Sequence, residues 1–250
     1  MLKVNVENVS LTGDENRQTL LQNINFELNE GKIYTILGKN GTGKSTLIKA
    51  LTGLLNNKLF TTEGTVFFND QNIFTIEPEE LRRLKQNKIR YVFQDAVNSF
   101  DPLKTFNYYF KNSFAEKESI DSLLKYFLLP SYKEISKLYP YEVSGGMAQR
   151  LSMVLAFAVN PKLIIFDEPT SGVDYAVSNL LLLKLNEYTK EENNIALLVT
   201  QDINFAERSS DEIALLSDGT LSSFKTNHDF FNQHDNEALN EFINSYNEIK

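Results

Sequence analysis

The stretch "GKNGTGKS", which runs from Gly38 to Ser45, has the residue types and spacing of a phosphate-binding loop. Its glycines let the backbone curl so that N–H groups and the start of the next helix point at phosphate oxygens. A glycine-rich turn could match by chance, but a β-rich run precedes the loop and a helical pattern follows it. Lys44 offers a mobile cation, and Ser45 offers a hydroxyl to Mg²⁺. The expected phosphate-binding residues are Gly38, Asn40, Gly41, Gly43, Lys44, Ser45 and Thr46.

An acidic pair, Asp167 and Glu168, ends the apolar run of "LIIFDEPT". Beside a phosphate loop, a carboxylate at the end of a buried strand can hold Mg²⁺, and a second can polarise an attacking water. We therefore assign the metal to Asp167 and Ser45, and the role of general base to Glu168. On its own, such a pair would more often be a solvated strand end. The phosphate loop makes that alternative the poorer one.

A second glycine-containing motif opens a predicted helix in "YEVSGGMAQRLSMVLAFAVNP". Ser144 is placed to cap this helix, and apolar residues recur along one face of it. The free N–H groups at such a helix start bind anions. Because the chain already has a phosphate loop, we expect Ser144, Gly145 and Gly146 to face the nucleotide of another subunit.

Alternating strands and helices must position these motifs. The runs "KIYTIL", "KIRYVF", "KLIIFD" and "NIALLVT" are typical of buried strands, and helical patterns separate them. We therefore predict an α/β fold with a mostly parallel sheet covered by helices. Three further strands are predicted at the front, in "VNVENV", "INFEL" and "TVFFND", and a hairpin is predicted in "DEIALLSDGTLSSF".

Residues 100–142 interrupt this alternation with helical patterns and no evident buried strand. We predict a helical subdomain inserted there, with residues 1–99 and 143–225 forming the α/β core. Residues 226–250 are predicted to form a helical tail that packs on its own domain. One face of a tail helix would carry Ala238, Leu239, Phe242, Ile243 and Tyr246.

Composition narrows the class of protein. The chain has 250 residues, 42% of them hydrophobic, which is enough for one large domain or two small ones. A net charge of -8 argues against a general nucleic-acid binder. The absence of cysteine excludes disulfides and thiolate metal sites and fits a reducing compartment. No apolar run approaches the length that spans a bilayer, so we expect any membrane association to come through a partner.

The phosphate loop, "VSGGM", "FDEPT" and "SGVD", in this order, resemble the nucleotide-binding subunit of ABC transporters over about residues 2–225. The resemblance implies an ABC-type fold with an antiparallel N-terminal β part, and ATP and Mg²⁺ as ligands. By it, Gln94 would link Mg²⁺ and water to the membrane partner, and Asp174 would lie at the dimer seam. An exposed turn is the alternative for Gln94. "DAVNSFDPLKT" and Met147 are similar to peptide and nickel importers.

Three positions depart from the family pattern. The stretch "TGDENRQ" carries no aromatic ring where the family stacks one on adenine, and Val143 replaces a leucine. Gln201 stands between Thr200 and Asp202, where the family has a histidine that contacts the terminal phosphate. A glutamine amide cannot become cationic, so losing a charge-assisted contact could cost about 1.5 to 3 kcal/mol, or ten- to a hundredfold in rate. An ordinary turn residue is the alternative for Gln201.

The resemblance implies a cellular location and partner proteins. We expect an ATPase subunit at the cytoplasmic face of the membrane, driving import of a peptide, nickel or metal chelate. It would work with two membrane permease subunits, an extracellular solute-binding protein and a second, different ATPase subunit, and without nucleic acid. The alternatives are a nucleotide-binding partner that completes another subunit's active site, and an ABC ATPase that is not an importer.

Overall fold

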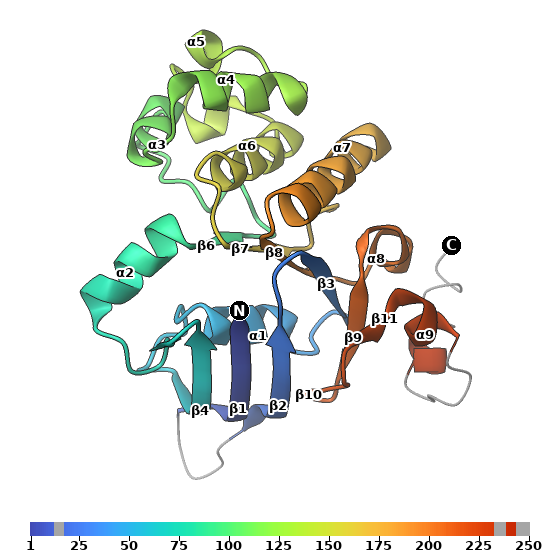
Figure 1. Cartoon of the computed structure of the whole chain (residues 1–250). Coiled ribbons are helices and arrows are strands. Elements are labelled where there is room, and N and C mark those ends of the chain that lie inside the picture. The colour runs from blue at the N-terminus through green and yellow to red at the C-terminus, as the bar shows by residue number, and fades with distance from the viewer. Residues whose placement is uncertain (13–17, 233–238, 244–250) are drawn as a thin grey trace.

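Two β-sheets frame the molecule in the computed structural model, which describes residues 1–12, 18–232 and 239–243. Across the first sheet the strands are β2 (Thr19–Leu28), β1 (Leu2–Leu11), β4 (Phe60–Phe68) and β5 (Gln71–Asn72). All neighbours in this sheet are antiparallel. Residues of β1 are alternately buried and exposed from Leu2 to Glu7, as expected of a sheet with one face on the core. The predicted N-terminal antiparallel part is confirmed (Figure 1).

The second sheet holds the predicted parallel strands. Its order is β10 (Thr220–Leu221), β9 (Glu212–Ser217), β3 (Lys32–Leu37), β8 (Ile195–Thr200), β7 (Leu163–Asp167) and β6 (Ile89–Val92), and β11 (Lys225–Thr226) also pairs with β9. Strands β9, β3, β8, β7 and β6 are parallel, whereas β10 pairs antiparallel with β9 in the predicted hairpin. Every residue of β7 and β8 is buried, because both faces of the sheet are covered.

Helices cover both faces of the parallel sheet. In chain order, the helices are α1 (Lys44–Leu51), α2 (Pro78–Asn87), α3 (Phe106–Asn112), α4 (Lys117–Tyr126), α5 (Tyr132–Ile135), α6 (Gly145–Phe157), α7 (Tyr175–Asn186), α8 (Ile203–Ser209) and α9 (Asn227–Phe231). A π-helical turn, Glu187–Glu191, continues α7. Helix α1 shares one apolar cluster with both sheets, so it lies between them. Within the described residues, no helix combines the length and apolarity needed to cross a membrane.

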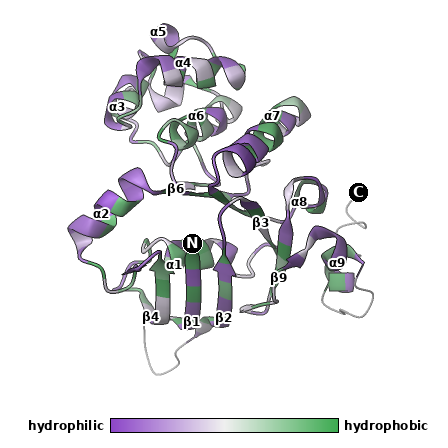
Figure 2. Cartoon of the chain, in the orientation of Figure 1, coloured by the Kyte–Doolittle hydropathy of each residue, from purple (hydrophilic) through white to green (hydrophobic). Residues whose placement is uncertain are grey.

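A group of helices stands above the other face of the sheet, between β6 and β7 in sequence (Figure 1). Helix α6 contacts α4 on one side and β6 on the other, so it connects this group to the sheet. Buried aromatic residues of α3, including Phe106 and Phe110, belong to the same apolar cluster as α6 and β7. In Figure 2, α2 is mostly hydrophilic, and Leu84 is its one buried side chain. Helix α2 therefore contributes little to the core.

The C-terminal part packs on the β9 edge of the parallel sheet. Phe230 of α9 joins Leu239 and Phe242 in a cluster with residues of α8 and β9, and Ile243 packs against it. These contacts agree with the predicted apolar face of the tail. Ala238 and Tyr246, which were expected on the same face, lie outside the described residues.

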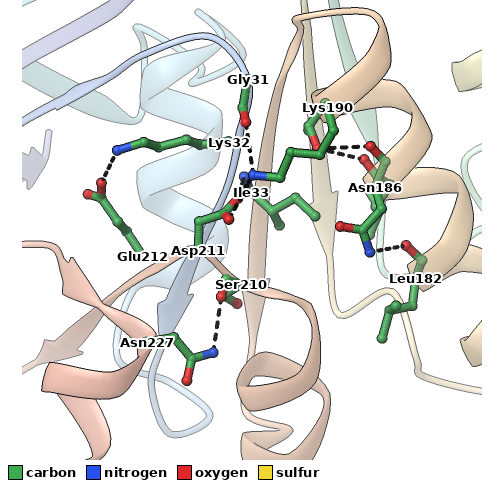
Figure 3. A network of polar contacts seen from close by, with 12 residues as sticks. Gly31, Lys32, Ile33, Leu182, Asn186, Lys190, Ser210, Asp211, Glu212 and Asn227 are labelled. Carbon is green, nitrogen blue, oxygen red and sulfur yellow. Dashed lines mark hydrogen bonds and ion pairs between the residues drawn. The ribbon is translucent and has the colours of Figure 1, made fainter.

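A polar network holds the amino-terminal edge of the parallel sheet, opposite the edge where β3 enters the phosphate loop (Figure 3). The Asp211 carboxylate accepts a hydrogen bond from the Ile33 N–H at 2.7 Å. Lys190 donates to both Asp211 carboxylate oxygens, at 2.7 and 2.8 Å, and to the Gly31 carbonyl at 3.0 Å. The network thus ties the π-helical turn, the start of β3 and the start of β9 together.

We expect Asp211→Ala to lower the free energy of unfolding by about 1–3 kcal/mol, because the buried Ile33 N–H would lose its carboxylate acceptor. Asp211→Asn keeps an acceptor oxygen and loses the ionic attraction and one hydrogen bond to the half-exposed Lys190. It should therefore cost less than about 1 kcal/mol. Urea unfolding of both variants measures the difference. Equal midpoints for Asp211→Ala and the wild type would contradict this role.

Candidate active site

The phosphate loop begins where β3 ends and closes at the first turn of α1. Gly41 and Gly43 have φ angles of 83° and 97°, which side chains other than glycine rarely adopt. A Cβ atom on Gly43 would also approach Leu21 Cδ2 to 3.0 Å. Local backbone geometry and packing therefore both explain the glycine at this position. The predicted helix follows the loop directly, and α1 begins at Lys44.

Lys44 is buried at the centre of the loop, with 6% of its surface exposed. Its ammonium donates to the carbonyls of Gly38 at 2.8 Å and Lys39 at 3.0 Å. It also forms an ion pair with Glu168, with 3.2 Å between Nζ and Oε1, although the directions do not suit a hydrogen bond. Because the cation is buried, this pairing is stronger than it would be in water. An incoming phosphate must compete with Glu168 for Lys44.

Asp167 is placed and oriented as a metal ligand would need to be. It ends β7, is 3% exposed, and accepts a hydrogen bond from the Tyr91 hydroxyl at Oδ2, at 2.8 Å. Burial, followed by the nearby Asp167 charge, raises the pKa of Tyr91 well above its ordinary value, so the hydroxyl stays protonated. The other oxygen, Oδ1, is buried and has no hydrogen-bond partner among the described residues. With the Ser45 hydroxyl beside the same pocket, these oxygens fit Mg²⁺.

Glu168 has an unusual backbone, with a φ angle of 48°. Such left-handed conformations cost energy for residues other than glycine and occur often at functional sites. Its Oε2 accepts hydrogen bonds from the Thr200 hydroxyl at 2.8 Å and from the Gln201 backbone N–H at 3.2 Å. Neither acidic side chain is a solvated strand end, because both are buried. The end of β8 therefore fixes the position of the predicted base.

A pocket of about 240 Å³ brings most of the predicted residues together. Its lining consists of Asn40, Gly41, Gly43, Lys44, Ser45, Thr46, Gln94, Asp167 and Glu168. Gln94 is exposed just beyond the end of β6, so its amide can reach a ligand in this pocket. The arrangement places a cation, two carboxylates, a hydroxyl and an amide around one space. Such a set can bind phosphate with a divalent metal and activate a water.

The predicted second anion site lies outside this pocket. Ser144 caps α6, with its hydroxyl accepting from the Met147 N–H at 3.2 Å, and both Ser144 and Gly145 are exposed. Gly146 lies against the "SGVD" loop, since a Cβ atom there would be 3.0 Å from the Gly172 carbonyl oxygen. Asp174 is exposed and caps α7 by accepting from the Val177 N–H at 2.9 Å. The two loops thus form one exposed surface apart from the chain's own phosphate pocket.

Gln201 follows β8 directly, at the edge of the sheet where the phosphate loop lies. Its side chain is exposed and makes no hydrogen bond with the described part of the chain. Only its backbone takes part in the site, through Glu168. The residues from Gly13 to Arg17, where the family would carry an adenine-stacking ring, lie outside the described residues.

Sequence reasoning missed two residues that hold the acidic pair, Thr200 and Tyr91. The signal for Thr200 was its place at the end of the predicted buried strand "NIALLVT". The observed register brings this strand end close to the acidic pair, because Asp167 pairs with Val199. The signal for Tyr91 was weaker: a hydroxyl within the predicted buried strand "KIRYVF".

Known proteins resemble this chain in sequence along most of its length. The oligopeptide transport ATP-binding protein OppD of Salmonella typhimurium is 30% identical, with 93% of this chain and 72% of OppD aligned. The metal-staphylopine import system ATP-binding protein CntD of Staphylococcus aureus is 29% identical, over 88% of this chain and 84% of CntD.

Solved structures agree with these similarities. An ATP binding subunit of an ABC transporter superposes with a TM-score of 0.77 at 26% identity, covering 98% of each chain. The dimeric ATP-binding cassette MJ0796, bound to ADP and Pi after hydrolysis, gives a TM-score of 0.76 at 26% identity and covers 90% of this chain and 98% of its own. A family model described as ABC transporter matches residues 21–171. The chain therefore belongs to the ABC transporter family, as one of its ATPase subunits.

Proposed function

We propose that this chain binds and hydrolyses ATP to power import of a peptide or a metal chelate, nickel complexes included. The observation that carries the proposal is the single pocket in which Lys44, Ser45, Asp167 and Glu168 meet. The similarity of the chain to proteins named for oligopeptide transport and metal-staphylopine import supports the proposed class of solute. Two separate membrane permeases and an extracellular solute-binding protein would complete the transporter, with this chain at the cytoplasmic face of the membrane.

Competition for Lys44 begins the proposed reaction. Phosphate and Glu168 are both anions that need the same buried cation, so phosphate binding weakens the Lys44–Glu168 pair. Glu168 then becomes available to accept a proton from the attacking water, while the end of β8 holds its Oε2. When bound, Mg²⁺ neutralises charge on the phosphate oxygens. Ser45 and Asp167 would hold this ion, with Gln94 beside them.

The same proposal includes slow ATP hydrolysis at this chain's own site. The Gln201 backbone N–H donates to Glu168 and the side chain is exposed. By the family resemblance its neutral amide would face the terminal phosphate, to which it can donate one hydrogen bond but cannot supply positive charge. The loss of a charge-assisted contact in the transition state corresponds to about 1.5–3 kcal/mol. A different ATPase subunit with a stronger site would then carry most of the turnover in a heterodimer.

We expect Gln201→His to raise single-turnover ATP hydrolysis at this chain's own site by about ten- to a hundredfold in a reconstituted complex whose partner ATPase is inactivated, because a histidine can become cationic near the terminal phosphate. Phosphate release from bound, radiolabelled ATP measures the rate. Gln71→His, on the exposed edge strand β5 of the other sheet, is the matched control and should change nothing. If Gln201→His leaves the rate unchanged while Glu168→Gln abolishes it, Gln201 does not limit this site.

A second candidate function is that of a nucleotide-binding partner whose main task is to complete another subunit's active site. The exposed start of α6 favours it, because Ser144 and Gly145 lie outside the chain's own pocket and remain accessible. Mass measurement of the purified complex tests the heterodimer that both functions assume. Two copies of this chain in one transporter would contradict both the heterodimer and the weak-site division of labour.

A further inference from the structure

The hydrogen bond between Tyr91 and Asp167 joins the strand before Gln94 to the predicted metal site. Tyr91 lies on β6, and its hydroxyl donates to Asp167 Oδ2 at 2.8 Å. The Tyr91 ring packs against Phe93, with 4.2 Å between ring centroids, so the hydroxyl is held from two directions. The position of this donor is thus set by the strand and by a neighbouring ring.

The hydrogen bond from Tyr91 restricts rotation of the Asp167 carboxylate. The last torsion of an aspartate side chain is broad, so rotation of the carboxylate is cheap unless a partner fixes it. With Oδ2 engaged by Tyr91, the free oxygen is Oδ1, which is buried and has no hydrogen-bond partner among the described residues. Asp167 also lines the pocket that contains Ser45. One carboxylate oxygen is therefore kept for a ligand.

We propose that Tyr91 is a positioning residue for Mg²⁺, which presents Asp167 Oδ1 to the ion through the hydrogen bond to Oδ2. This inference rests on the proposed function of the pocket, because it concerns the metal that accompanies ATP. Tyr91 does not touch the ion; it acts only through Asp167. Groups that orient a metal ligand in this way typically account for ten- to a hundredfold in metal affinity.

Tyr91→Phe tests the inference, because it removes the hydroxyl and keeps the ring that packs on Phe93. The full chain is titrated with Mg²⁺ at a fixed concentration of a fluorescent, non-hydrolysable ATP analogue, and bound analogue is the readout. We expect the Mg²⁺ concentration at half-saturation to rise by about tenfold. Binding at saturating Mg²⁺ should return to the wild-type level, because the phosphate loop is intact.

Tyr126→Phe is the matched control. It also removes one tyrosine hydroxyl, which donates to the Leu180 carbonyl at 2.9 Å. Tyr126 does not line the phosphate pocket. Its Mg²⁺ midpoint should equal that of the wild type. An unchanged midpoint in Tyr91→Phe would overturn the inference, and so would a loss of binding that saturating Mg²⁺ does not restore. If the wild type itself binds no analogue at any Mg²⁺ concentration, the proposed function fails instead.

Discussion

In a complex whose partner ATPase is inactivated by the matching change, Glu168→Gln is expected to lower single-turnover ATP hydrolysis at this chain's own pocket by at least about a hundredfold, because an amide cannot accept the proton of the attacking water. The glutamine oxygen can still accept from the Thr200 hydroxyl and the Gln201 N–H, so the site should keep its shape. Since the change also removes the charge that competes for Lys44, ATP affinity should stay equal or increase. Phosphate release and equilibrium nucleotide binding measure the two effects separately.

The control for Glu168→Gln is Glu187→Gln, which removes a glutamate that pairs with Lys184 on the surface of α7. This control should hydrolyse ATP at the wild-type rate. Hydrolysis that persists at this chain's own pocket in Glu168→Gln would assign the base role to another group. Reduced ATP affinity in the same variant would contradict the competition between phosphate and Glu168.

Lys44→Met is expected to weaken ATP binding by at least ten- to a hundredfold, about 1.5–3 kcal/mol, through loss of the cation that contacts phosphate. It should also destabilise the protein by about 3 kcal/mol, because it leaves the buried Glu168 charge without its ion-pair partner. Nucleotide titration and urea unfolding measure the two losses.

The double variant Lys44→Met/Glu168→Gln separates these contributions. It should recover much of the stability, because the unpaired charge is gone, while ATP binding stays weak. Lys125→Met, which removes an exposed lysine on α4, is the control and should affect neither quantity. Equal instability of the single and double variants would show that the Lys44–Glu168 pair does not carry the stability effect.

Local sequence patterns predicted the helices and strands of the fold, because the residues that determine each element lie close together in the sequence. The apolar run into "GKNGTGKS" gave the strand, loop and helix around Lys44, and the run into Asp167 gave the buried strand that ends beside it. The cap at Ser144 was predicted in the same way, from one residue and the helix pattern after it. Within these stretches the agreement is close.

Long-range pairing could not be predicted from those patterns. Periodicity does not say that β3 lies between β8 and β9, or that β1 pairs with β4 as well as β2. It also does not reveal a bond such as that from Tyr91 to Asp167, which joins residues 76 positions apart. The left-handed backbone of Glu168 is likewise set by its tertiary surroundings, since glutamate has no local preference for it.

Phosphate release at each site of the assembled transporter tests the central claim, that this chain hydrolyses ATP slowly at its own pocket while a different subunit does most of the work. One complex carries Glu168→Gln in this chain, and the other carries the matching change in the partner ATPase. We predict that the complex with Glu168→Gln in this chain keeps most of the wild-type single-turnover rate. The complex with the change in the partner ATPase should hydrolyse ATP about ten- to a hundredfold more slowly than the wild type. Equal rates in the two complexes would contradict the account.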